Sequence, residues 1–562
     1  MATGRRFKIS KQASFCVTLF LLILALYVVT LKIVPVSDNQ SNNFLPWLMI
    51  KKHTITCDYL KPGSNDYMYY PHDGHYYSTF PPGVAFAALP VYAIPSLFIH
   101  VASNYSMEIL AKISASIMMA LAGVLIFLIA FQLSRNKRTA IITTVVFSFA
   151  TGIFAMASQM LLTFTGAILF LVLGTYCLVK GNGRNRYLIG AGFCFAYAGF
   201  CQPVNFVFLL IFGLYVLRNR WKDLPLYTLG AVPPVLVLAV YSYVAFGSPF
   251  KMGDVVATSQ ILGGNWSVKV PLSKMWTTPL LRGLTGTLFS PSRGIFVFSP
   301  VLIFAFVGLY MVWRLRGRYT VLGYGFIGSA IVVLTSAVWW DWLGGNGFGY
   351  RVTLSAIPFL SLLLIPAMPR IRSRRWVMAV FAVLLVFSIF VQVVGYLSYD
   401  GGSWEARNIL VYKDGKYERT FNNIWSFSNN QLAWEIKSFH FYVSGPWQAS
   451  KDDPARDTEL GHVLVREVKP GSVAVGVETS SSRIALIGII IYHSDTNEVV
   501  TNLTMSVPRG EFTAWTEPIS IDETNLKMEV GVSNVGVGDE YWIKGDLNIE
   551  ALLHQREIKK QN

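Results

Sequence analysis

The sequence predicts an α-helical polytopic membrane protein with about 11 transmembrane helices and a C-terminal extracytoplasmic β-sandwich domain. The 562 residues are 53% hydrophobic and 14% charged, with a mean hydropathy of +0.46. This composition is too apolar for an ordinary soluble protein. Apolar runs long enough to cross a hydrocarbon core of ~30 Å recur between residues 14 and 397. After residue 400 they give way to short alternating strands.

The start of the chain predicts the orientation of the first span. The basic segment GRRFKISKQ precedes the apolar run 14–36, and no small-residue cleavage site accompanies that run. We therefore expect a retained first span and not a signal peptide. Because positive charge favours the cytoplasmic side of a membrane, the N-terminus is expected in the cytoplasm.

Further apolar runs alternate with basic clusters. The runs expected to cross the membrane are 110–134, 139–157, 161–180, 222–246, 295–313, 319–340, 352–368 and 377–397, and the clusters expected in the cytoplasm include RNKR (135–138), RLRGR (314–318) and PRIRSRR (369–375). The region 187–217 is flanked by basic clusters and interrupted by GFCQPVN, which predicts two short helices that return to the same side. The net charge of +16 therefore indicates membrane topology and not a nucleic-acid-binding surface.

The run 80–102 is apolar but contains four prolines. Each proline removes a backbone donor that lipid cannot replace. If the N-terminus and residues 135–138 are both cytoplasmic, one of the three apolar runs before residue 135 cannot cross. We expect residues 80–102 to lie along or dip into the outer face of the membrane, within one large external loop, 37–109.

The C-terminal part has a different pattern. Segments such as SRIALIGIIIYHS and EVVTNLTMSV alternate apolar and polar residues between Gly, Asn and Asp. This alternation is typical of antiparallel strands. We therefore divide the chain into a transmembrane domain, 1–400, and an extracytoplasmic β-sandwich domain, 401–562. The five cysteines predict neither a disulfide framework nor a CxxC metal site.

The first external loop gathers ionisable and aromatic side chains beside the apolar run. Its candidate residues are Asp58, Asp66, Asp73, His75, Tyr76 and Tyr77. A carboxylate that aromatic neighbours partly desolvate becomes more basic, which suits it to taking a proton from a hydroxyl. The alternative is that the acids are solvated loop residues and the tyrosines form an interfacial belt. His72 and His75 lack a third ligand at a recognisable spacing, so the pattern gives no support for a divalent metal.

A second candidate segment is VWWDWLGGNGFGYRV, residues 338–352, at the external end of two spans. Trp340 and Asp341 precede the glycines of this segment, and Arg351 follows them. A guanidinium is always charged and binds phosphate oxygens in a bidentate manner, so Arg351 suits a lipid phosphate. Simple anchoring at the interface explains the same residues without a ligand.

A third candidate region is rich in Gly and Pro. It comprises FGSPFKMGD (246–254) and GLTGTLFSPSRGIFVFSP (283–300), in which Arg293 precedes an apolar run. Arg293 lies at the expected aqueous boundary and is therefore a second candidate phosphate ligand. A re-entrant loop explains the glycines and prolines without any ligand.

Four segments, taken in order, carry a family resemblance. DGHYYSTFPPGVAFAALPVYAI, FGSPF, GLTGTLFSPSRGIFVFSPV and WLGGNGFGYRVTLSAIPFL resemble the landmarks of GT-C class polytopic glycosyltransferases, in particular protein-mannosyltransferase-like and arabinosyltransferase-like bacterial members. The resemblance covers residues 14–400. It implies a sugar donor on a polyprenyl-phosphate carrier and a catalytic carboxylate in the first external loop, where Asp58 and Asp66 both fit. The second external loop, where the family often supplies an acid or a histidine, offers Gln159, which leaves metal dependence open.

We therefore predict a multi-pass plasma-membrane glycosyltransferase that moves a sugar to an acceptor hydroxyl with inversion. Asp58, or alternatively Asp66, is the expected base, and Arg351 with Arg293 is expected to hold the donor phosphate. The expected substrate-binding residues are Asp73, His75, Tyr76, Tyr77, Trp340 and Asp341. The expected partners are membrane lipid, the lipid-linked sugar donor and a glycan, lipid or protein acceptor. No nucleic acid is expected, and the sequence establishes no cofactor.

Two other functions fit parts of the pattern. A transporter or flippase of a lipid-linked sugar would place ionisable groups near the membrane midplane and often shows inverted repeats, whereas this sequence has few charges in its spans and no evident repeat. A non-catalytic receptor or assembly subunit would use the C-terminal domain as its binding module. An assay of sugar transfer separates these alternatives from the enzyme.

Overall fold

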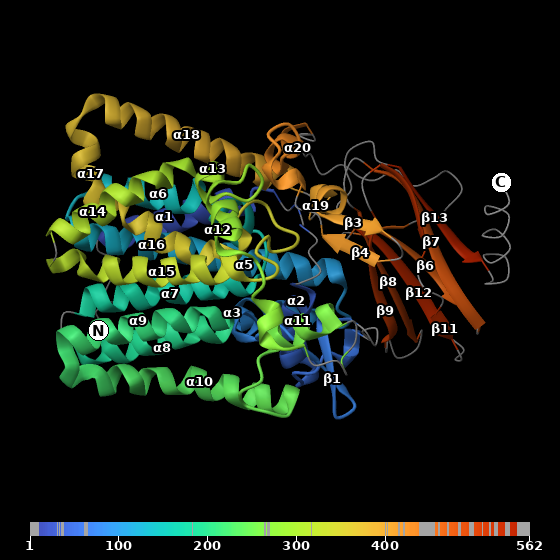
Figure 1. Ribbon diagram of the computed structural model, residues 1–562. Coiled ribbons are helices and arrows are strands. Elements are labelled where there is room, and N and C mark those ends of the chain that lie inside the picture. The colour runs from blue at the N-terminus through green and yellow to red at the C-terminus, as the bar shows by residue number, and fades with distance from the viewer. Residues whose placement is uncertain are drawn as a thin grey trace, which may run out of the picture.

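We describe the fold from a computed structural model (Figure 1). The structure describes residues 11–437, apart from 31, 33, 35–38, 61–65, 182–183, 264–265, 267–269, 316, 400, 402, 414–415 and 420–421, together with the strands between residues 456 and 547. Residues 4–10 of the basic N-terminal segment, on which the predicted cytoplasmic N-terminus depends, lie outside the described residues.

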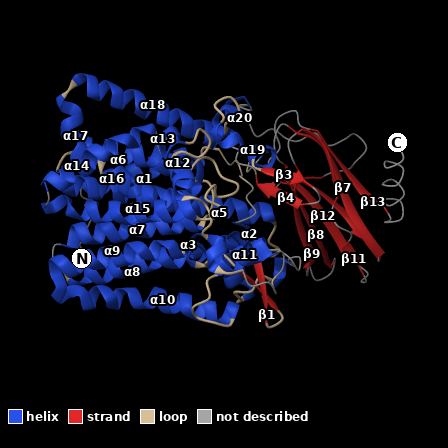
Figure 2. Cartoon of the chain, viewed as in Figure 1, coloured by secondary structure: helices blue, strands red, loops and turns tan. Residues whose placement is uncertain are grey.

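Helices of the N-terminal part run side by side and form a bundle (Figures 1 and 2). The bundle helices are α1 (Lys11–Val28), α5 (Asn104–Ser134), α6 (Lys137–Phe149), α7 (Thr163–Gly181), α8 (Asn185–Cys201), α9 (Phe206–Arg220), α10 (Leu224–Phe246), α14 (Ala305–Leu315), α15 (Thr320–Val338), α16 (Ile357–Leu362), α17 (Leu364–Ser373) and α18 (Arg375–Ser398). The shorter helices are α2 (Gln40–Trp47), α3 (Gly83–Tyr92), α4 (Pro95–Phe98), α11 (Gly253–Gly263), α12 (Leu280–Phe289), α13 (Ile295–Phe298), α19 (Ser403–Asn408) and α20 (Gln431–Lys437).

Several helical stretches are long and apolar enough to cross a membrane. Among the described residues these are Ser106–Ser134, Thr163–Gly181, Pro203–Phe246, Thr320–Val338 and Arg375–Ser398, and the bent pair Arg351–Leu362 and Leu364–Ser373 adds one more if it is a single span. Other predicted spans form shorter helices, such as Gln12–Val28 and Pro300–Leu315. The chain is thus a multi-pass helical membrane protein, and the count of about 11 spans stays a prediction.

The bundle helices approach one another closely where glycine replaces larger residues. A Cβ atom at Gly192 in α8 would collide with the carbonyl of Tyr227 in α10, and one at Gly230 in α10 would collide with the carbonyl of Ile189 in α8. This reciprocal contact brings the two backbones together, as is common between membrane helices. The opposite side of α10 exposes apolar residues that include Leu236, which suits contact with lipid.

The two segments interrupted by proline form short helices, and their positions relative to the membrane stay predictions. The 187–217 region forms α8 and α9, separated by a short 3₁₀ turn, Pro203–Asn205. Residues 80–102 form only the short helices α3 and α4, with Pro90 inside the first and Pro95 at the start of the second. Ile94, Leu97 and Phe98 of this segment are exposed apolar side chains.

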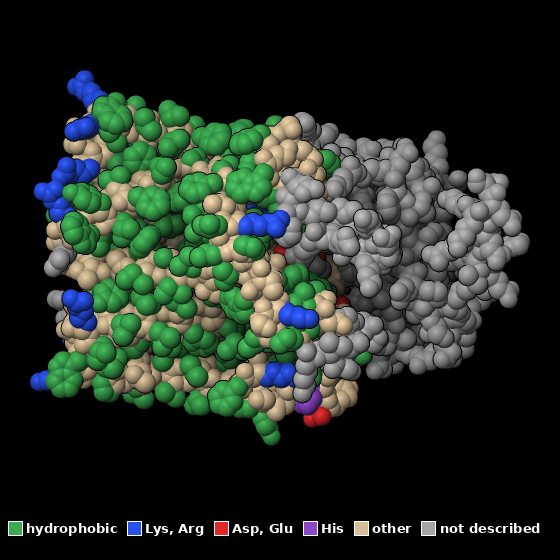
Figure 3. Space-filling model, viewed as in Figure 1, with side chains coloured by type: hydrophobic (Ala, Val, Ile, Leu, Met, Phe, Trp, Pro, Cys, Tyr) green, Lys and Arg blue, Asp and Glu red, His purple; other side chains and the backbone are tan. Residues whose placement is uncertain are grey.

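Charged side chains lie unevenly over the bundle. Figure 3 shows apolar side chains over most of its visible surface and a row of Lys and Arg side chains at the end opposite the C-terminal strands. Basic residues terminate or begin several helices, including α9, α17 and α18. This distribution matches the positive-inside pattern, and the assignment of that end to the cytoplasm stays a prediction.

Antiparallel strands dominate the chain after α20 (Figure 2). They are β5 (Arg456–Thr458), β6 (Gly461–Val468), β7 (Gly471–Ser481), β8 (Ala485–His493), β9 (Val499–Val507), β10 (Gly510–Trp515), β11 (Ile519–Ile521), β12 (Leu526–Ser533) and β13 (Glu540–Leu547). One sheet has the order β5-β6-β12-β8-β9, and a second has β10, β11 and β13 paired with β7. The strands agree with the predicted period-two pattern. The sandwich packing, its extracytoplasmic location and the domain boundary at residue 401 stay predictions.

Residues between α18 and these strands belong structurally beside the bundle. They form α19, the hairpin β3 (Leu410–Lys413) and β4 (Lys416–Arg419), and α20. Helix α20 packs against α18, and Trp404 and Gln431 are fully buried. The segment 403–437 therefore continues the packed core of the membrane part.

Candidate active site

A β-hairpin forms the centre of the first external loop. Strands β1 (Tyr69–His72) and β2 (His75–Ser78) are antiparallel, with His72 opposite His75. The turn residues Asp73 and Gly74 both have positive φ, of 49° and 79°, as a two-residue turn of this type requires. The side chain of Asp73 is 84% exposed and lies 3.6 Å from His72. Asp73 thus occupies the tip of the hairpin, where its backbone conformation explains its presence.

Asp58 and His75 are brought together by this hairpin. Asp58 begins a short 3₁₀ helix, η3 (Asp58–Leu60), and its Oδ2 lies 2.7 Å from Nδ1 of His75. Its Oδ1 accepts a hydrogen bond of 2.7 Å from the backbone N–H of Tyr76. The side chains of Asp58 and His75 are 39% and 55% exposed. An accessible carboxylate oriented by two donors is suited to accept a proton from a hydroxyl.

Asp66 has a different environment. Its Oδ1 accepts a hydrogen bond of 3.0 Å from the backbone N–H of Met68, and its carbonyl accepts one from Tyr69. These bonds form the turn that leads into β1. Burial raises the pKa of Asp66, and the bond from Met68 opposes the rise. Asp66 therefore has a structural task at this position, and its role as a base stays a prediction.

The two tyrosines of β2 face different surroundings. Tyr77 is buried in a cluster with Tyr241, Phe246 and Val256. Desolvation first, and then the negative charges of Asp58 and Asp73, raise the pKa of Tyr77. Tyr76 is partly buried against the main core, and its backbone is the group that contacts Asp58. Their substrate-binding roles stay predictions.

Helix α11 packs against the first loop and adds a carboxylate to which sequence analysis gave no role. A Cβ atom at Gly253 would collide with the carbonyl of Thr79, so the start of α11 touches the end of the hairpin. Asp254 lies in the first turn of α11, and burial raises its pKa from 3.8 to about 6. Nζ of Lys251 lies 3.0 Å from the hydroxyl of Tyr70. In the sequence, Asp254 was marked only by its place in the segment FGSPFKMGD (246–254). Its desolvation is visible only in the packing of the fold.

Arg351 is buried at the other candidate segment. It begins a 3₁₀ helix, η10 (Arg351–Ala356), and is 8% exposed. A Cβ atom at Gly345 would lie 3.8 Å from Nη2 of Arg351 and 4.0 Å from Oδ2 of Asp341. Sequence analysis grouped these two residues, and the structure brings them to the same side of the loop. Trp340 is partly buried, and its backbone N–H donates to the carbonyl of Met275.

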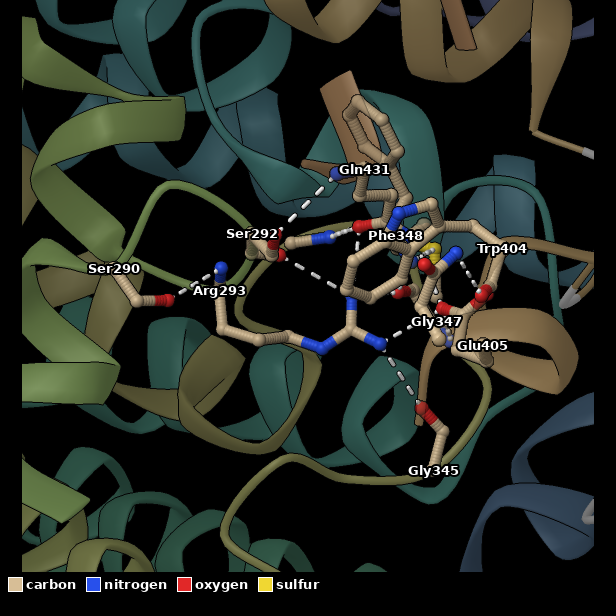
Figure 4. Close-up of polar contacts among 12 residues, drawn as sticks. Ser290, Ser292, Arg293, Gly345, Gly347, Phe348, Trp404, Glu405 and Gln431 are labelled. Atoms are coloured by element: carbon tan, nitrogen blue, oxygen red, sulfur yellow. Dashed lines mark hydrogen bonds and ion pairs between the residues drawn. The ribbon is translucent and has the colours of Figure 1, made fainter. Parts of the chain in front are cut away.

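Arg293 is enclosed by protein acceptors (Figure 4). Its guanidinium nitrogens donate to the backbone oxygens of Ser292 (3.3 Å), Gly345 (3.3 Å) and Gly347 (2.8 Å), to Oε1 of Gln431 (2.7 Å) and to Oε1 of Glu405 (2.8 Å). The side chains of Arg293 and Glu405 are 2% and 1% exposed. Burial raises the pKa of Glu405, and the Arg293 cation opposes that rise. These contacts give Arg293 a structural role, and its role as a phosphate ligand stays a prediction.

The first loop and η10 are connected through α7 and through the end of α8. Helix α3 of the first loop and η10 both pack against α7. A Cβ atom at Gly83 in α3 would collide with the backbone at Cys201, the last residue of α8. The next residue, Gln202, accepts a hydrogen bond of 3.4 Å from Ser355 in η10. The break between α8 and α9 thus lies between the two candidate regions.

Possible metal ligands and thiols are present among the described residues. Among the residues that the structure describes, no three His, Cys, Asp or Glu side chains form a group that could hold a metal ion. The five cysteines are free thiols. Gln159, which sequence analysis noted in the second loop, is buried and donates to the carbonyl of Tyr27 and to the hydroxyl of Ser158.

Comparison with known proteins gives a likeness among solved structures. No family model and no curated protein matches the chain. Among solved structures, the chain is similar to ArnT from Cupriavidus metallidurans in the apo state, with 15% sequence identity and a TM-score of 0.39. The likeness covers 65% of this chain and 61% of ArnT, so the chain spans less than two thirds of that protein.

Proposed function

We propose that the protein is a GT-C-like membrane glycosyltransferase that moves a sugar from a polyprenyl-phosphate donor to an acceptor hydroxyl. The observation that carries the proposal is the Asp58–His75 pair, an accessible and oriented carboxylate in a loop beside an exposed apolar segment. Chemistry on a lipid-linked sugar needs a proton acceptor in water next to a surface that tolerates a prenyl chain. The motif resemblance described above supports the same function.

Asp58 acts as the base in this proposal. As the acceptor oxygen attacks the anomeric carbon, its proton passes to Asp58, and the bond from the anomeric carbon to the phosphate oxygen breaks. The electron pair leaves with the polyprenyl phosphate, and a single displacement inverts the anomeric centre. The bonds from His75 and the Tyr76 N–H hold the carboxylate in place. Positioning and proton removal together supply the catalysis.

Arg351 stabilises the phosphate as it leaves. The guanidinium remains charged at every relevant pH, and its burial strengthens its interaction with an anion. It begins η10, which packs against α7, and α3 of the first loop packs against the same helix. Asp341, close to the same loop position, keeps its predicted part in substrate binding.

The prenyl chain and the acceptor use surfaces on the two sides of Asp58. The exposed apolar residues Ile94, Leu97 and Phe98 provide contact for the prenyl chain within the lipid. The edge strand β9 packs beside η3, which begins at Asp58. A glycan, lipid or protein acceptor held by the C-terminal sheets would therefore reach the base directly. We place the reaction on the outer face of the plasma membrane, with the basic end of the bundle in the cytoplasm.

The test is transfer of sugar from a polyprenyl-phosphate sugar to candidate acceptors by the purified chain. Asp58→Asn should lower kcat by at least about 100-fold, since an amide cannot accept the proton. Asp223→Asn is the control, because that carboxylate pairs with Arg220 at 3.1 Å at the basic end of the bundle, and it should leave the rate unchanged. Wild-type rates in Asp58→Asn would exclude this mechanism. Movement of the lipid across vesicles without transfer would support the flippase.

A further inference from the structure

The loop that precedes Arg351 is held by three buried side chains from distant parts of the chain. Arg293 comes from the turn after α12, Glu405 from α19 and Gln431 from α20. These three side chains contact one another, since Oε1 of Glu405 accepts from both Arg293 and Gln431 at 2.8 Å. Figure 4 shows them converging on Gly345 and Gly347. The network therefore joins the segment after the last bundle helix to the loop at 345–349.

Gly347 is the residue on which the network converges. Its carbonyl accepts from Nη1 of Arg293 at 2.8 Å and from Nε2 of Gln431 at 3.0 Å. Its N–H donates to Oε1 of Glu405 at 3.2 Å. Gly349 also donates to Oε1 of Gln431, at 2.8 Å. Both polar groups of the Gly347 backbone are thus fixed by side chains, which is unusual control for an irregular glycine-rich loop.

The side chain of Arg351 packs directly on Gly347. A Cβ atom at Gly347 would lie 2.9 Å from Cδ and 3.0 Å from Cβ of Arg351. A methyl group at residue 347 would therefore have to displace the side chain of Arg351. A shift of the Gly347 backbone would therefore move the stem of Arg351 and, with it, the guanidinium.

The ion pair inside the network is not explained by stability alone. Arg293 and Glu405 are almost completely buried, and the loss of hydration largely offsets the attraction between such charges. Buried ion pairs are best known where they specify one arrangement among several. Here the arrangement that they specify is the path of residues 345–349.

We propose that Arg293, Glu405 and Gln431 are positioning residues that set the place of Arg351 through Gly347. The inference rests on the proposed function, because it assumes that Arg351 binds the donor phosphate. It assigns Arg293 a task other than phosphate contact and gives the segment 403–437 a part in donor binding. Binding of the phosphate group should then depend on residues that never touch it.

The experiment measures binding of two probes to the detergent-solubilised full chain, a polyprenyl monophosphate and the corresponding polyprenol. The ratio of their Kd values reports the phosphate contact and cancels losses that affect the whole lipid site. Arg351→Ala should abolish the preference for the phosphate. Glu405→Gln should lower the preference by about tenfold and leave polyprenol binding unchanged. Asp223→Asn is the matched control, because it removes the carboxylate of an Arg220 ion pair, at 3.1 Å, at the basic end of the bundle.

Combining the variants decides between direct and indirect action. If Glu405 acts through Arg351, Glu405→Gln should cause no further loss in the Arg351→Ala background. Gly347→Ala leaves the ion pair intact and pushes on Arg351 alone, so it should also lower the preference and serves where Glu405→Gln fails to fold. If well-folded Glu405→Gln and Gly347→Ala both keep the preference for the phosphate while Arg351→Ala loses it, the positioning role is wrong. The proposed phosphate contact of Arg351 would then still stand. A wild-type chain without any phosphate preference would overturn both the inference and the proposed role of Arg351.

Discussion

The carboxylate of Asp58 lies 2.7 Å from Nδ1 of His75, although the two residues are 17 positions apart in the chain. The contact depends on the alignment of η3 with β2, in which the N–H of Cys57 donates to the carbonyl of Tyr76 at 2.7 Å. Since the same alignment directs the Tyr76 N–H to Asp58, the carboxylate is oriented by two bonds from one strand.

Replacement of His75 tests whether this orientation matters. His75→Ala removes one of the two donors, and we expect kcat for sugar transfer to fall by about 10-fold to 100-fold, less than in Asp58→Asn. In His75→Asn the side-chain amide can donate from nearly the position of Nδ1, so most of the rate should return. His72→Ala, across the hairpin, serves as control. Equal rates in the alanine and asparagine variants of His75 would contradict the orienting role.

Asp254 should make stability depend on pH. Its pKa is about 6 in the folded chain and 3.8 in the reference state, so between these values the folded state binds more protons than the unfolded state. Stability must therefore fall as pH rises through this window. Asp254→Asn should reduce that fall and raise the thermal midpoint above pH 6. If stability falls equally steeply with pH in Asp254→Asn and in the wild type, Asp254 is not the cause. Asp73→Asn is the control, and its stability should follow pH as in the wild type.

Gly253→Ala tests the contact between α11 and the first loop. The added methyl group would meet the carbonyl of Thr79, so the helix must shift, and we expect a loss of about 1–3 kcal/mol in stability. Gly213→Ala is the matched control, because its methyl group would lie at an ordinary 3.5 Å from Tyr227. Equal thermal midpoints for the two variants would mean that α11 can move away from the hairpin without loss.

Removal of divalent metal should leave sugar transfer unchanged. The proposed mechanism uses the guanidinium of Arg351, and not a metal cation, to stabilise the phosphate as it leaves. The measurement compares initial rates before and after treatment with a chelator, with magnesium added back. Loss of activity that magnesium restores would show that a cation shares the role assigned to Arg351.

The helical architecture was largely predictable because its signals are local. Length and apolarity predict the spans, and Pro203 predicts the break between α8 and α9. The short helices at 80–102 follow from the same reasoning, since Pro90 and Pro95 interrupt any longer helix. The number of crossings is harder to predict, because several apolar runs form helices shorter than a full span.

The candidate site was predictable only as a set of residues. Asp58 and His75 were both candidates, but their pairing depends on a hairpin register that local sequence does not reveal. The desolvation of Asp254 comes from packing between segments far apart in the chain. Arg293 is the clearest example, because its partners Glu405 and Gln431 lie in a region that sequence analysis assigned to the β-sandwich domain.

The burial of Arg293 against Glu405 and Gln431 has a consequence for how the protein is made. The ribosome delivers residue 431 only after every bundle helix has been synthesised, so the glycine-rich loop at 345–349 acquires its last hydrogen bonds at the end of translation. A chain truncated after α18 would leave Arg293 without its counter-ion Glu405 and without the bond to Gln431. The final local order of this loop therefore depends on residues that follow the bundle helices.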